Sequence, residues 1–411
     1  MRANNQVTLA KDIYWVGKID DREVPFHRLV LAKGTTYNAY LLKTGKPTVI
    51  DTVDIEFGGE FVEYLKEFID PKDIQYIVIN HTEPDHSGGL GALAGQAPDA
   101  TIVCTQKAVK ELQEMYKLHD RTFLVVKDGD TLDIGGKTLK FKETPYLHTE
   151  ETMITYCVED QILFPCDIFS THIANDQFFN DDAKNDITED FIGYYKLIIH
   201  PHRRYVQTLI NALKEMDVKM IAPSHGYILR TDVQKYIDLY ASMSANTAAD
   251  KKVTIVYTTI KSNTKKMANM LKDSFEKNNI KADVFNADKS EKEVILTSIK
   301  EADAVLVGSS TRYADMIGNL EQILTELPNM ELAGKLGAAF GSYGWSGEAI
   351  EVIQDYLEKT DMNILNTSKV IKSTGMIDVE FPVRVRFSPK ESAEKIENSA
   401  SFISDLLLST I

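Results

Sequence analysis

Two different rhythms of apolar and polar residues divide the chain into two regions. In the first 240 residues or so, short apolar runs predict many short strands with a few helical patterns between them. The predicted strands lie at 29–32, 38–42, 48–51, 77–79, 101–104 and 124–126. Helical periodicity occurs at 58–69, 105–116, 187–199 and 202–216. This mixed order predicts a layered α/β sandwich with mixed sheets.

The second region alternates strictly between strands and helices. It follows a polar, small-residue stretch at 241–252, which we interpret as an interdomain boundary. Strands are predicted at 253–257, 282–285, 302–308 and 336–340, each followed by a helical pattern. Such alternation is typical of a doubly wound parallel sheet. We therefore predict two domains, 1–250 and 251–411.

The overall composition restricts the kinds of binding partner and the cellular compartment that we expect. A formal net charge of −15 argues against nucleic acid or an anionic membrane as partner. Cys104, Cys157 and Cys166 form no Cys-x-x-Cys pattern, which excludes an iron–sulfur or rubredoxin-type site and favours a reducing compartment. The N-terminus has no apolar leader and no segment is long enough to span a bilayer, so we expect a soluble, cytoplasmic protein.

The most informative motif is His-Thr-Glu-Pro-Asp-His-Ser-Gly-Gly at residues 81–89, directly after the apolar run 74–80. Four of its side chains can bind a metal: His81, Glu83, Asp85 and His86. Ligands at the end of a strand are held in place, and imidazoles with carboxylates suit Zn, Fe, Mn or Ni. The lack of thiolates argues against a structural zinc site.

Three further residues lie just past predicted strands, where α/β proteins place their sites: His148, Asp167 and His225. Each alone is as well explained by an ordinary hydrogen-bonded loop. Three other histidines, His119, His200 and His202, are predicted to be structural or solvent-facing.

The pattern His-x-Glu-x-Asp-His resembles the metal-binding signature of the metallo-β-lactamase fold. Hydrolases of that fold usually carry His-x-His-x-Asp-His, and the replacement by Glu83 is similar to the flavodiiron proteins, also called A-type flavoproteins. A carboxylate in place of an imidazole favours iron over zinc and stabilises the oxidised metal. The resemblance implies an N-terminal metallo-β-lactamase-like αββα sandwich followed by a flavodoxin-like domain.

The resemblance also implies a ligand set for two iron ions. One iron would be held by His81, Glu83 and His148, the other by Asp85, His86 and His225, with Asp167 as the bridge. His27, His172 and Tyr195 resemble positions of the family's substrate pocket, where they would donate protons or hydrogen bonds, although ordinary surface or core roles remain open.

Two segments depart from the family's usual pattern. After His148 the family commonly shows Trp-Pro-Asp-Ser-Met, whereas this chain has Thr-Glu-Glu-Thr-Met at 149–153. Around the bridging aspartate, Ala-Phe-Gly is replaced by Ile-Phe-Ser at 168–170. These changes spare the ligands, and they leave the shape of the pocket and its preferred gas open.

Three loops of the second region follow predicted strands and predict a flavin site. A hydroxyl-rich loop before a helix can bind a phosphate, although a plain helix cap is the alternative, and aromatic rings in the later loops can stack on an isoalloxazine. The candidate residues are Thr258, Thr259, Lys261, Ser262, Asn263 and Thr264 in the first loop, Ser310, Thr311, Arg312 and Tyr313 in the second, and Ser342, Tyr343, Gly344, Trp345 and Gly347 in the third. The pattern resembles flavodoxin and implies FMN, and the absence of Gly-x-Gly-x-x-Gly argues against a dinucleotide.

The leading hypothesis is an oxidoreductase in which FMN passes electrons to a diiron site that reduces O₂ to water, NO to N₂O, or both. Electrons are expected from a separate protein of the rubredoxin or flavin-reductase type, since no further module follows residue 411, and the resemblance implies a head-to-tail homodimer or a dimer of dimers. Two alternatives remain: a dinuclear zinc hydrolase with an accessory flavodoxin domain, and an electron-carrying flavoprotein with an empty or structural N-terminal site.

Overall fold

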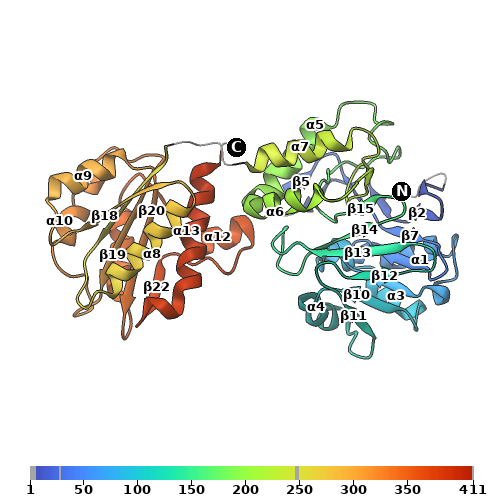
Figure 1. Ribbon diagram of the computed structural model, residues 1–411, viewed down its shortest axis with the longest axis horizontal. Helices are drawn as coiled ribbons and strands as arrows, with labels where there is room; N and C mark the ends of the chain where they lie inside the picture. Colours follow the sequence, from blue (N-terminus) through green and yellow to red (C-terminus); the bar gives the residue numbers. More distant parts are fainter. Residues whose placement is uncertain (1–5, 27–28, 246–249, 410–411) are drawn as a thin grey trace. The chain divides into compact units, whose positions relative to one another are not determined.

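The computed structural model describes residues 6–26, 29–245 and 250–409. The chain separates into two compact units, Met1–Ala245 and Asn246–Ile411 (Figure 1). Each unit has its own apolar cores, which are formed by its own strands and helices.

The first unit contains a seven-stranded mixed sheet and a five-stranded sheet. The order of the larger sheet is β1 (Thr8–Ala10), β2 (Ile13–Trp15), β7 (Tyr40–Leu42), β8 (Thr48–Ile50), β9 (Tyr76–Val78), β10 (Thr101–Cys104) and β11 (Phe123–Val125). The smaller sheet runs β12 (Thr131–Asp133), β13 (Thr138–Glu143), β14 (Met153–Cys157), β15 (Ile162–Phe164) and β16 (Met220–Ile221). Two hairpin-like pairs complete the strands, β3 (Lys18–Asp20) with β6 (Thr35–Tyr37) and β4 (Val24–Phe26) with β5 (Leu29–Leu31).

Helices cover both sheets of this unit. Beside the larger sheet lie α1 (Gly58–Leu65), α3 (Leu90–Gln96) and α4 (Gln106–Tyr116), and beside the smaller one lie α5 (Thr188–Tyr194), α6 (Arg203–Leu213) and α7 (Val233–Ser244) (Figure 1). Strand β14 shows the layering: Met153 and Cys157 belong to the core between the sheets, while Ile154 and Tyr156 pack with α5–α7. A strand buried on both faces is expected to be apolar throughout.

The observed elements of this unit correct three predicted boundaries. The helix predicted over 58–69 ends at Leu65, and the helical pattern at 187–199 splits into α5 and a π-helical turn, Tyr195–Ile199. Helix α7 continues to Ser244, so the polar stretch at 241–252 begins inside a helix. The outer face of α7 is polar because the helix is amphipathic. Composition alone cannot distinguish such a helix face from a linker.

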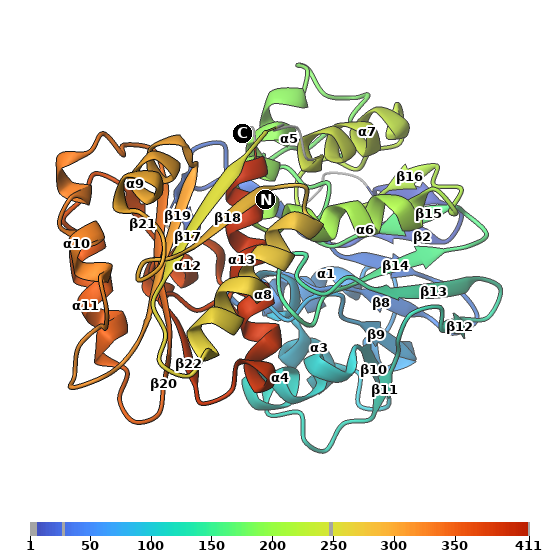
Figure 2. The ribbon, with the colours of Figure 1, turned by 60° about the vertical axis from the view of Figure 1, so that its left-hand side comes forward.

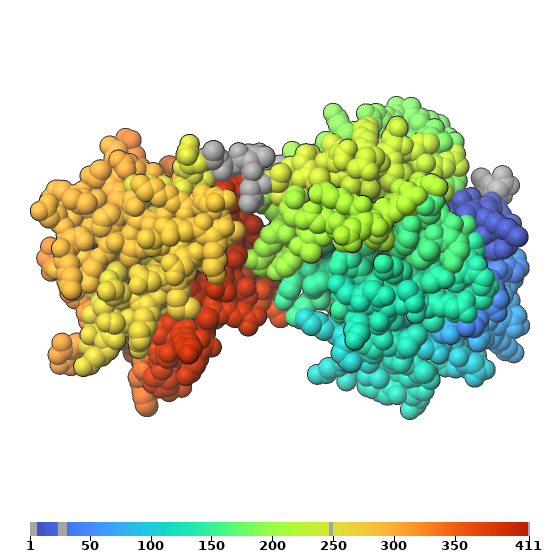
Figure 3. Space-filling view, in the orientation of Figure 1, coloured from blue at the N-terminus to red at the C-terminus, as the bar shows by residue number. Residues whose placement is uncertain are grey.

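The second unit is a parallel sheet with helices on both faces. The strand order is β18 (Lys281–Asn286), β17 (Lys252–Tyr257), β19 (Ala304–Ser310) and β20 (Leu336–Tyr343), and the two ends of β20 pair with β21 (Asn363–Ile364) and β22 (Val383–Arg386). On one face lie α8 (Asn263–Lys277), α12 (Thr367–Thr374) and α13 (Ala393–Leu408), and on the other α9 (Lys292–Glu301), α10 (Leu320–Leu324) and α11 (Glu348–Leu357) (Figure 2). In the view of Figure 3 the surface of this unit is formed largely by its first half, coloured yellow to orange.

The sandwich and the doubly wound sheet confirm the predicted fold class. Short turns of helix connect several elements: α2 (Pro84–Ser87) and the 3₁₀ turns Ile55–Phe57, Pro71–Asp73, His200–His202, Leu327–Asn329 and Pro389–Ser392. Within the described residues, none of the helices has the length and apolarity needed to cross a bilayer.

Candidate metal centre and flavin loops

The loop that carries the metal motif is anchored at its base. Asp51 accepts hydrogen bonds from the backbone N–H of Asn80 (2.8 Å) and from its side-chain amide (2.9 Å). The Thr155 hydroxyl, on a strand of the smaller sheet, donates to the Asn80 side-chain oxygen (2.7 Å). All three residues are buried. The residue before His81 is therefore tied to both sheets, which fixes where the ligand loop starts.

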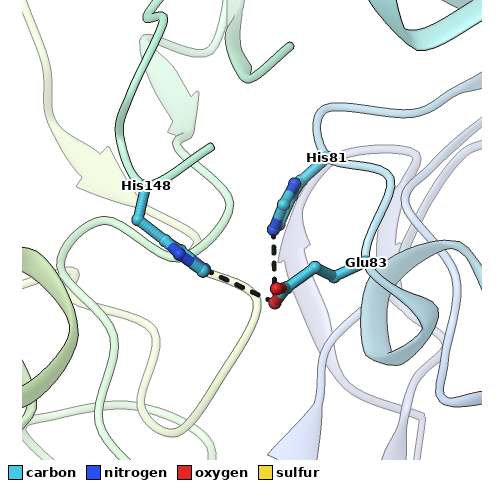
Figure 4. Close-up of side chains that lie close together, drawn as sticks. All are labelled: His81, Glu83 and His148. Carbon is cyan, nitrogen blue, oxygen red and sulfur yellow. Dashed lines mark ion pairs between the residues drawn. The ribbon is translucent and has the colours of Figure 1, made fainter. Parts of the chain in front are cut away.

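The first group of candidate ligands comes from two loops. The Nε2 atoms of His81 and His148 each lie 3.4 Å from Oε2 of Glu83 (Figure 4). One ligand atom from each of these three residues falls within 4.8 Å of the others. Both imidazoles thus point at the same carboxylate oxygen, and a single cation among the three could contact all of them.

A second group is built around Asp85. Its Oδ2 lies 3.4 Å from Nε2 of His86 and 3.3 Å from Nε2 of His225. Helix α2 begins at Pro84, so Asp85 and His86 share one turn of helix, whereas His225 comes from the loop after β16. This group again contains two imidazoles and one carboxylate.

Asp167 lies between the two groups. Its Oδ2 is 3.3 Å from Nε2 of His148 in the first group and 3.2 Å from Nε2 of His86 in the second. Its Oδ1 lies 3.4 Å from Nε2 of His225 and accepts a hydrogen bond of 2.6 Å from the Tyr194 hydroxyl. A carboxylate so placed can serve both metal positions.

The donor atoms of this cluster fit bound metal ions. The buried atoms that make no hydrogen bond within the described residues include Nε2 of His81, Nε2 of His86, Oδ2 of Asp85 and Oδ2 of Asp167. Buried polar atoms without a partner are costly, and their lone pairs converge here on two positions. The chain thus brings together all seven candidate ligands from the sequence, four imidazoles and three carboxylates.

The ring nitrogens facing away from the centre also have partners. Nδ1 of His81 lies 2.7 Å from Oε1 of Glu151, and Nδ1 of His225 lies 2.7 Å from the backbone carbonyl of Thr36. Nδ1 of His86 faces the Cys166 thiol sulfur at 3.6 Å. Such contacts fix the ring orientation and leave the other nitrogen for a metal.

Without metal, the cluster is a set of strongly interacting acids and bases. Burial alone would lower the pKa of His148 and His225, but the carboxylates beside them raise the pKa values to about 9 and about 10. Burial would raise the pKa of Asp167, yet the surrounding imidazoles, His86 first, hold it well below its usual range. In the metal-free centre, Asp167 is therefore ionised and His148 and His225 are protonated at neutral pH.

The predicted pocket residues differ in position. His172 is near the centre: its Nδ1 contacts the Thr35 hydroxyl at 2.9 Å, and its ring centroid lies 4.9 Å from that of His225. Tyr195 is buried beside Tyr240 (4.8 Å between centroids), and it is Tyr194 that donates to Asp167. His27 lies outside the described residues.

Sequence reasoning missed three residues around this centre. Tyr194 directly precedes Tyr195, which was selected by resemblance to the family's pocket, and nothing in the local sequence separates the two adjacent tyrosines. Glu151 stood out only as a departure from the family's usual segment. His202, predicted to be structural or solvent-facing, is buried with its ring centroid 6.2 Å from that of His148.

In the second unit, hydroxyl groups link the first and later flavin loops. The Thr258 hydroxyl contacts that of Ser309 at 2.9 Å, and the Thr264 hydroxyl contacts those of Ser310 and Ser342 at 2.9 Å each. Ser309 was not among the predicted residues, because nothing in sequence marks a strand residue as part of a loop network. The network holds the three loops at the carboxyl ends of β17, β19 and β20, where this fold binds ligands.

The first loop also presents features of a phosphate site. Ser262, in the left-handed region at φ 66°, leads into α8, and the Asn263 amide donates to the carbonyl of Phe387 at 3.0 Å. The hydroxyl oxygen of Thr259, and that of Thr311 in the second loop, are buried without a hydrogen-bond partner within the described residues. Phosphate oxygens at the start of a helix would satisfy such groups. Lys261 is exposed at the same loop.

Two aromatic side chains of these loops face solvent. Tyr313 and Trp345 are each 88% exposed, and the Arg312 guanidinium lies over the Tyr313 ring at 4.8 Å from its centroid. Tyr343 packs against Gly347, where φ is +81° and an added Cβ would lie 3.0 Å from the ring. Rings this exposed are unusual unless a ligand or partner covers them, and a flat flavin ring fits.

Comparisons with known proteins agree with this geometry. The family model described as ODP family beta lactamase matches residues 35–226, and the flavodoxin model matches residues 255–395. An anaerobic nitric oxide reductase flavorubredoxin of Escherichia coli is 37% identical over 360 residues, which cover 86% of this chain and 75% of that protein. An uncharacterised protein of Methanocaldococcus jannaschii is 35% identical over 92% of this chain and 93% of its own length.

Solved structures lead to the same family. The flavodiiron protein from Giardia intestinalis matches with a TM-score of 0.59 and 26% identity, covering 100% of this chain and 98% of its own. The rubredoxin oxygen:oxidoreductase from Desulfovibrio gigas matches with a TM-score of 0.58 and 28% identity, covering 98% of each chain. The resemblance predicted from the His-x-Glu-x-Asp-His motif is therefore confirmed. With both domain types matched and all seven candidate metal ligands brought together, this chain belongs to the flavodiiron family of oxidoreductases, whose cofactors are FMN and a pair of iron ions.

Proposed function

We propose that this protein reduces O₂ to water, with nitric oxide as the second candidate substrate. The observation that carries the proposal is the convergence of four imidazoles and three carboxylates on two adjacent positions, with Glu83 in place of a histidine. When bound, two irons and FMN supply the redox equivalents and a binding place for a diatomic gas. The carboxylate at Glu83 favours iron over zinc, which supports redox chemistry over hydrolysis.

The side chains set the charge of the centre. Three carboxylates contribute −3, against +4 for two ferrous ions, which leaves a net charge of about +1 in a buried site. Such a site attracts small anionic oxygen species and keeps them from escaping. The Tyr194 hydroxyl supports this arrangement, because it holds Asp167 through a hydrogen bond of 2.6 Å.

The reaction also consumes protons, since O₂ takes up four electrons and four protons to give two water molecules. We assign His172 as a proton donor to the substrate. Its ring lies 4.9 Å from those of both Tyr194 and His225 and is oriented by the Thr35 hydroxyl. His172→Gln should lower kcat about 100-fold, within the usual range for loss of a general acid. His119→Gln, at an exposed histidine, is the matched control and should change nothing.

Nitric oxide is retained as a candidate because relatives 37% identical to this chain are named anaerobic nitric oxide reductases. Two NO molecules with two electrons and two protons give N₂O and water. This reaction places the same demand on the side chains, a buried two-metal site with a proton donor beside it. We further propose that a separate rubredoxin or flavin-reductase type protein delivers the electrons, and that the chain works as a head-to-tail homodimer.

The test is an anaerobic reduction of the purified protein followed by mixing with each gas. With O₂, consumption without hydrogen peroxide is expected, and metal-stripped protein that keeps FMN should instead produce peroxide. Gas chromatography for N₂O measures the reaction with NO, and the larger kcat/KM identifies the preferred substrate. Peroxide as the main product of the intact protein would favour the electron-carrier hypothesis. Two bound zinc ions with esterase or thioesterase activity would favour the hydrolase.

A further inference from the structure

The two metal positions are nearly identical in their direct ligands. Each has two imidazoles and one carboxylate of its own, and Asp167 stands between them. The direct ligands therefore give no reason for the two metals to behave differently. Any difference has to come from the groups that contact the ligands.

The groups behind the histidines differ in charge. His81 faces the carboxylate of Glu151, which is 4% exposed, at 2.7 Å. In the second group, His225 faces the neutral backbone carbonyl of Thr36 at 2.7 Å, and His86 faces the thiol of Cys166 at 3.6 Å. An anionic acceptor draws the Nδ1 proton more strongly than a carbonyl or a thiol, and so makes the opposite nitrogen a stronger donor.

The surroundings of Glu151 hold it as an anion in one orientation. Its Oε1 lies 3.1 Å from the backbone N–H of Thr82 and 2.8 Å from the Thr149 hydroxyl, in addition to His81. The Thr82 hydroxyl is 2.9 Å away, but its one proton is shared with Oε2 of Glu111 at 2.6 Å. So many donors around one oxygen suit a carboxylate and not a carboxylic acid. The backbone carbonyl of Glu151 accepts a hydrogen bond of 2.8 Å from Thr105, the cap of α4. The residue is thus fixed at both its side chain and its backbone.

We propose that Glu151 is a positioning residue that makes the two metal sites unequal. By fixing the tautomer and raising the donor strength of His81, it makes the position at His81, Glu83 and His148 the tighter metal site and the one more easily oxidised. The proposal rests on the metal-binding part of the proposed function and is independent of the choice between O₂ and NO.

Glu151→Gln tests the proposal, because the amide keeps the size and the acceptor but loses the charge. The neighbouring Glu150→Gln is the matched control, since Glu150 is exposed and pairs with Lys107. Metal-stripped protein that retains FMN is titrated with cobalt(II) under anaerobic conditions, and binding is followed through the visible bands of the metal. We expect two tight steps in the parent and in Glu150→Gln. In Glu151→Gln one step should weaken 10–100-fold while the other stays unchanged.

A second measurement uses the iron-loaded protein. In a redox titration followed by electron paramagnetic resonance, Glu151→Gln should raise the midpoint potential of one iron. The midpoint potential of the other iron should stay unchanged. Glu151→Asp keeps the charge and should restore most of the cobalt affinity. Equal weakening of both steps, no weakening, or an aspartate variant as weak as the glutamine variant would each overturn the proposal. A parent protein that binds two cobalt ions yet turns over neither gas would contradict the proposed function alone.

Discussion

The two units of this protein use opposite means to hold a cofactor. The metal centre is buried, with His81, His86 and His225 at most 1% exposed, and its specificity comes from side chains that converge on two positions. The flavin loops use backbone and hydroxyl groups, and their two aromatic rings are each 88% exposed. A metal site needs particular donor atoms at fixed distances, whereas a flavin site needs a shaped surface. The first is therefore a rigid part of the core, and the second is completed by its ligand.

The largest effect is expected from Asp167, the residue proposed to bridge both metal positions. Asp167→Asn replaces an anion between two cations with a neutral amide and should lower gas reduction at least about 100-fold, beyond the 10–100-fold typical of an outer partner. Iron content should fall while FMN content stays normal, because the flavin loops belong to the other unit. Asp181→Asn, at a surface ion pair with Arg230, serves as control. Full activity in Asp167→Asn would contradict the assignment of the bridge.

Dividing the chain tests whether the two sites are independent. Each unit has separate cores, so residues 251–411 should fold alone and bind FMN to give a yellow protein, and residues 1–250 should bind iron without flavin absorbance. Absorbance spectra and metal analysis of each piece measure this. A C-terminal piece that binds no flavin, or that prefers a dinucleotide, would refute the phosphate loop at 258–264.

The contrast between the metal centre and the flavin loops also explains which features could be predicted from the sequence. The seven candidate ligands could be selected because their chemistry is unusual and each lies in a segment that follows a strand, and the structure brings all seven together. The choice of Tyr195 over Tyr194 came from resemblance to the family's pocket, and only the folded chain shows that the Tyr194 hydroxyl reaches Asp167. Glu151 acts through a contact with His81, 70 residues away, and no local pattern reports such a contact.

The flavin loops could be located but not described in detail. The predicted strands put these segments at one edge of the sheet, because parallel strands bring their carboxyl ends together, but β19 and β20 run on to Ser310 and Tyr343, so Ser310, Ser342 and Tyr343 are strand residues and not loop residues. The hydroxyl network through Ser309 and Ser342 joins residues of different strands, and its distances depend on how neighbouring strands pair. Pairing is a property of the folded sheet, so sequence supplied only the candidates.

A smaller effect is the dependence of thermal stability on pH, which we expect only in the first unit. In metal-free protein the pKa values of His148 and His225 are raised to about 9 and about 10, above the usual 6.5. Raised histidine pKa values stabilise the fold fully below about pH 6.5, and this stabilisation is lost as pH rises through 9 to 10. The thermal midpoint of metal-free residues 1–250 should thus fall between pH 7 and pH 10. Metal uptake at pH 7 should release at least two protons, measurable with an indicator dye, because the pKa of His81 is raised as well as those of His148 and His225.

Metal-loaded protein provides the comparison for this pH effect. Its histidines are deprotonated by coordination, so its thermal midpoint should depend much less on pH over the same range. The flavin unit, residues 251–411, contains no histidine and should show no such decline. A metal-free first unit that is equally stable at pH 7 and pH 10 would mean that the imidazoles and carboxylates are not paired as the structure places them.

The smallest effect is expected at Trp345, on the surface of the flavin site. An aromatic stacking contact contributes about 0.5–1.5 kcal/mol, so Trp345→Ala should weaken FMN binding by roughly 2- to 13-fold. Val294→Ala, an exposed apolar residue on α9, is the control and should leave FMN affinity unchanged. Fluorescence titration of flavin-free protein with FMN measures both. Because the hydroxyl network and the phosphate loop remain in Trp345→Ala, complete loss of FMN would show that the ring holds the loops together, and an unchanged affinity would show that it faces a partner protein instead of the flavin.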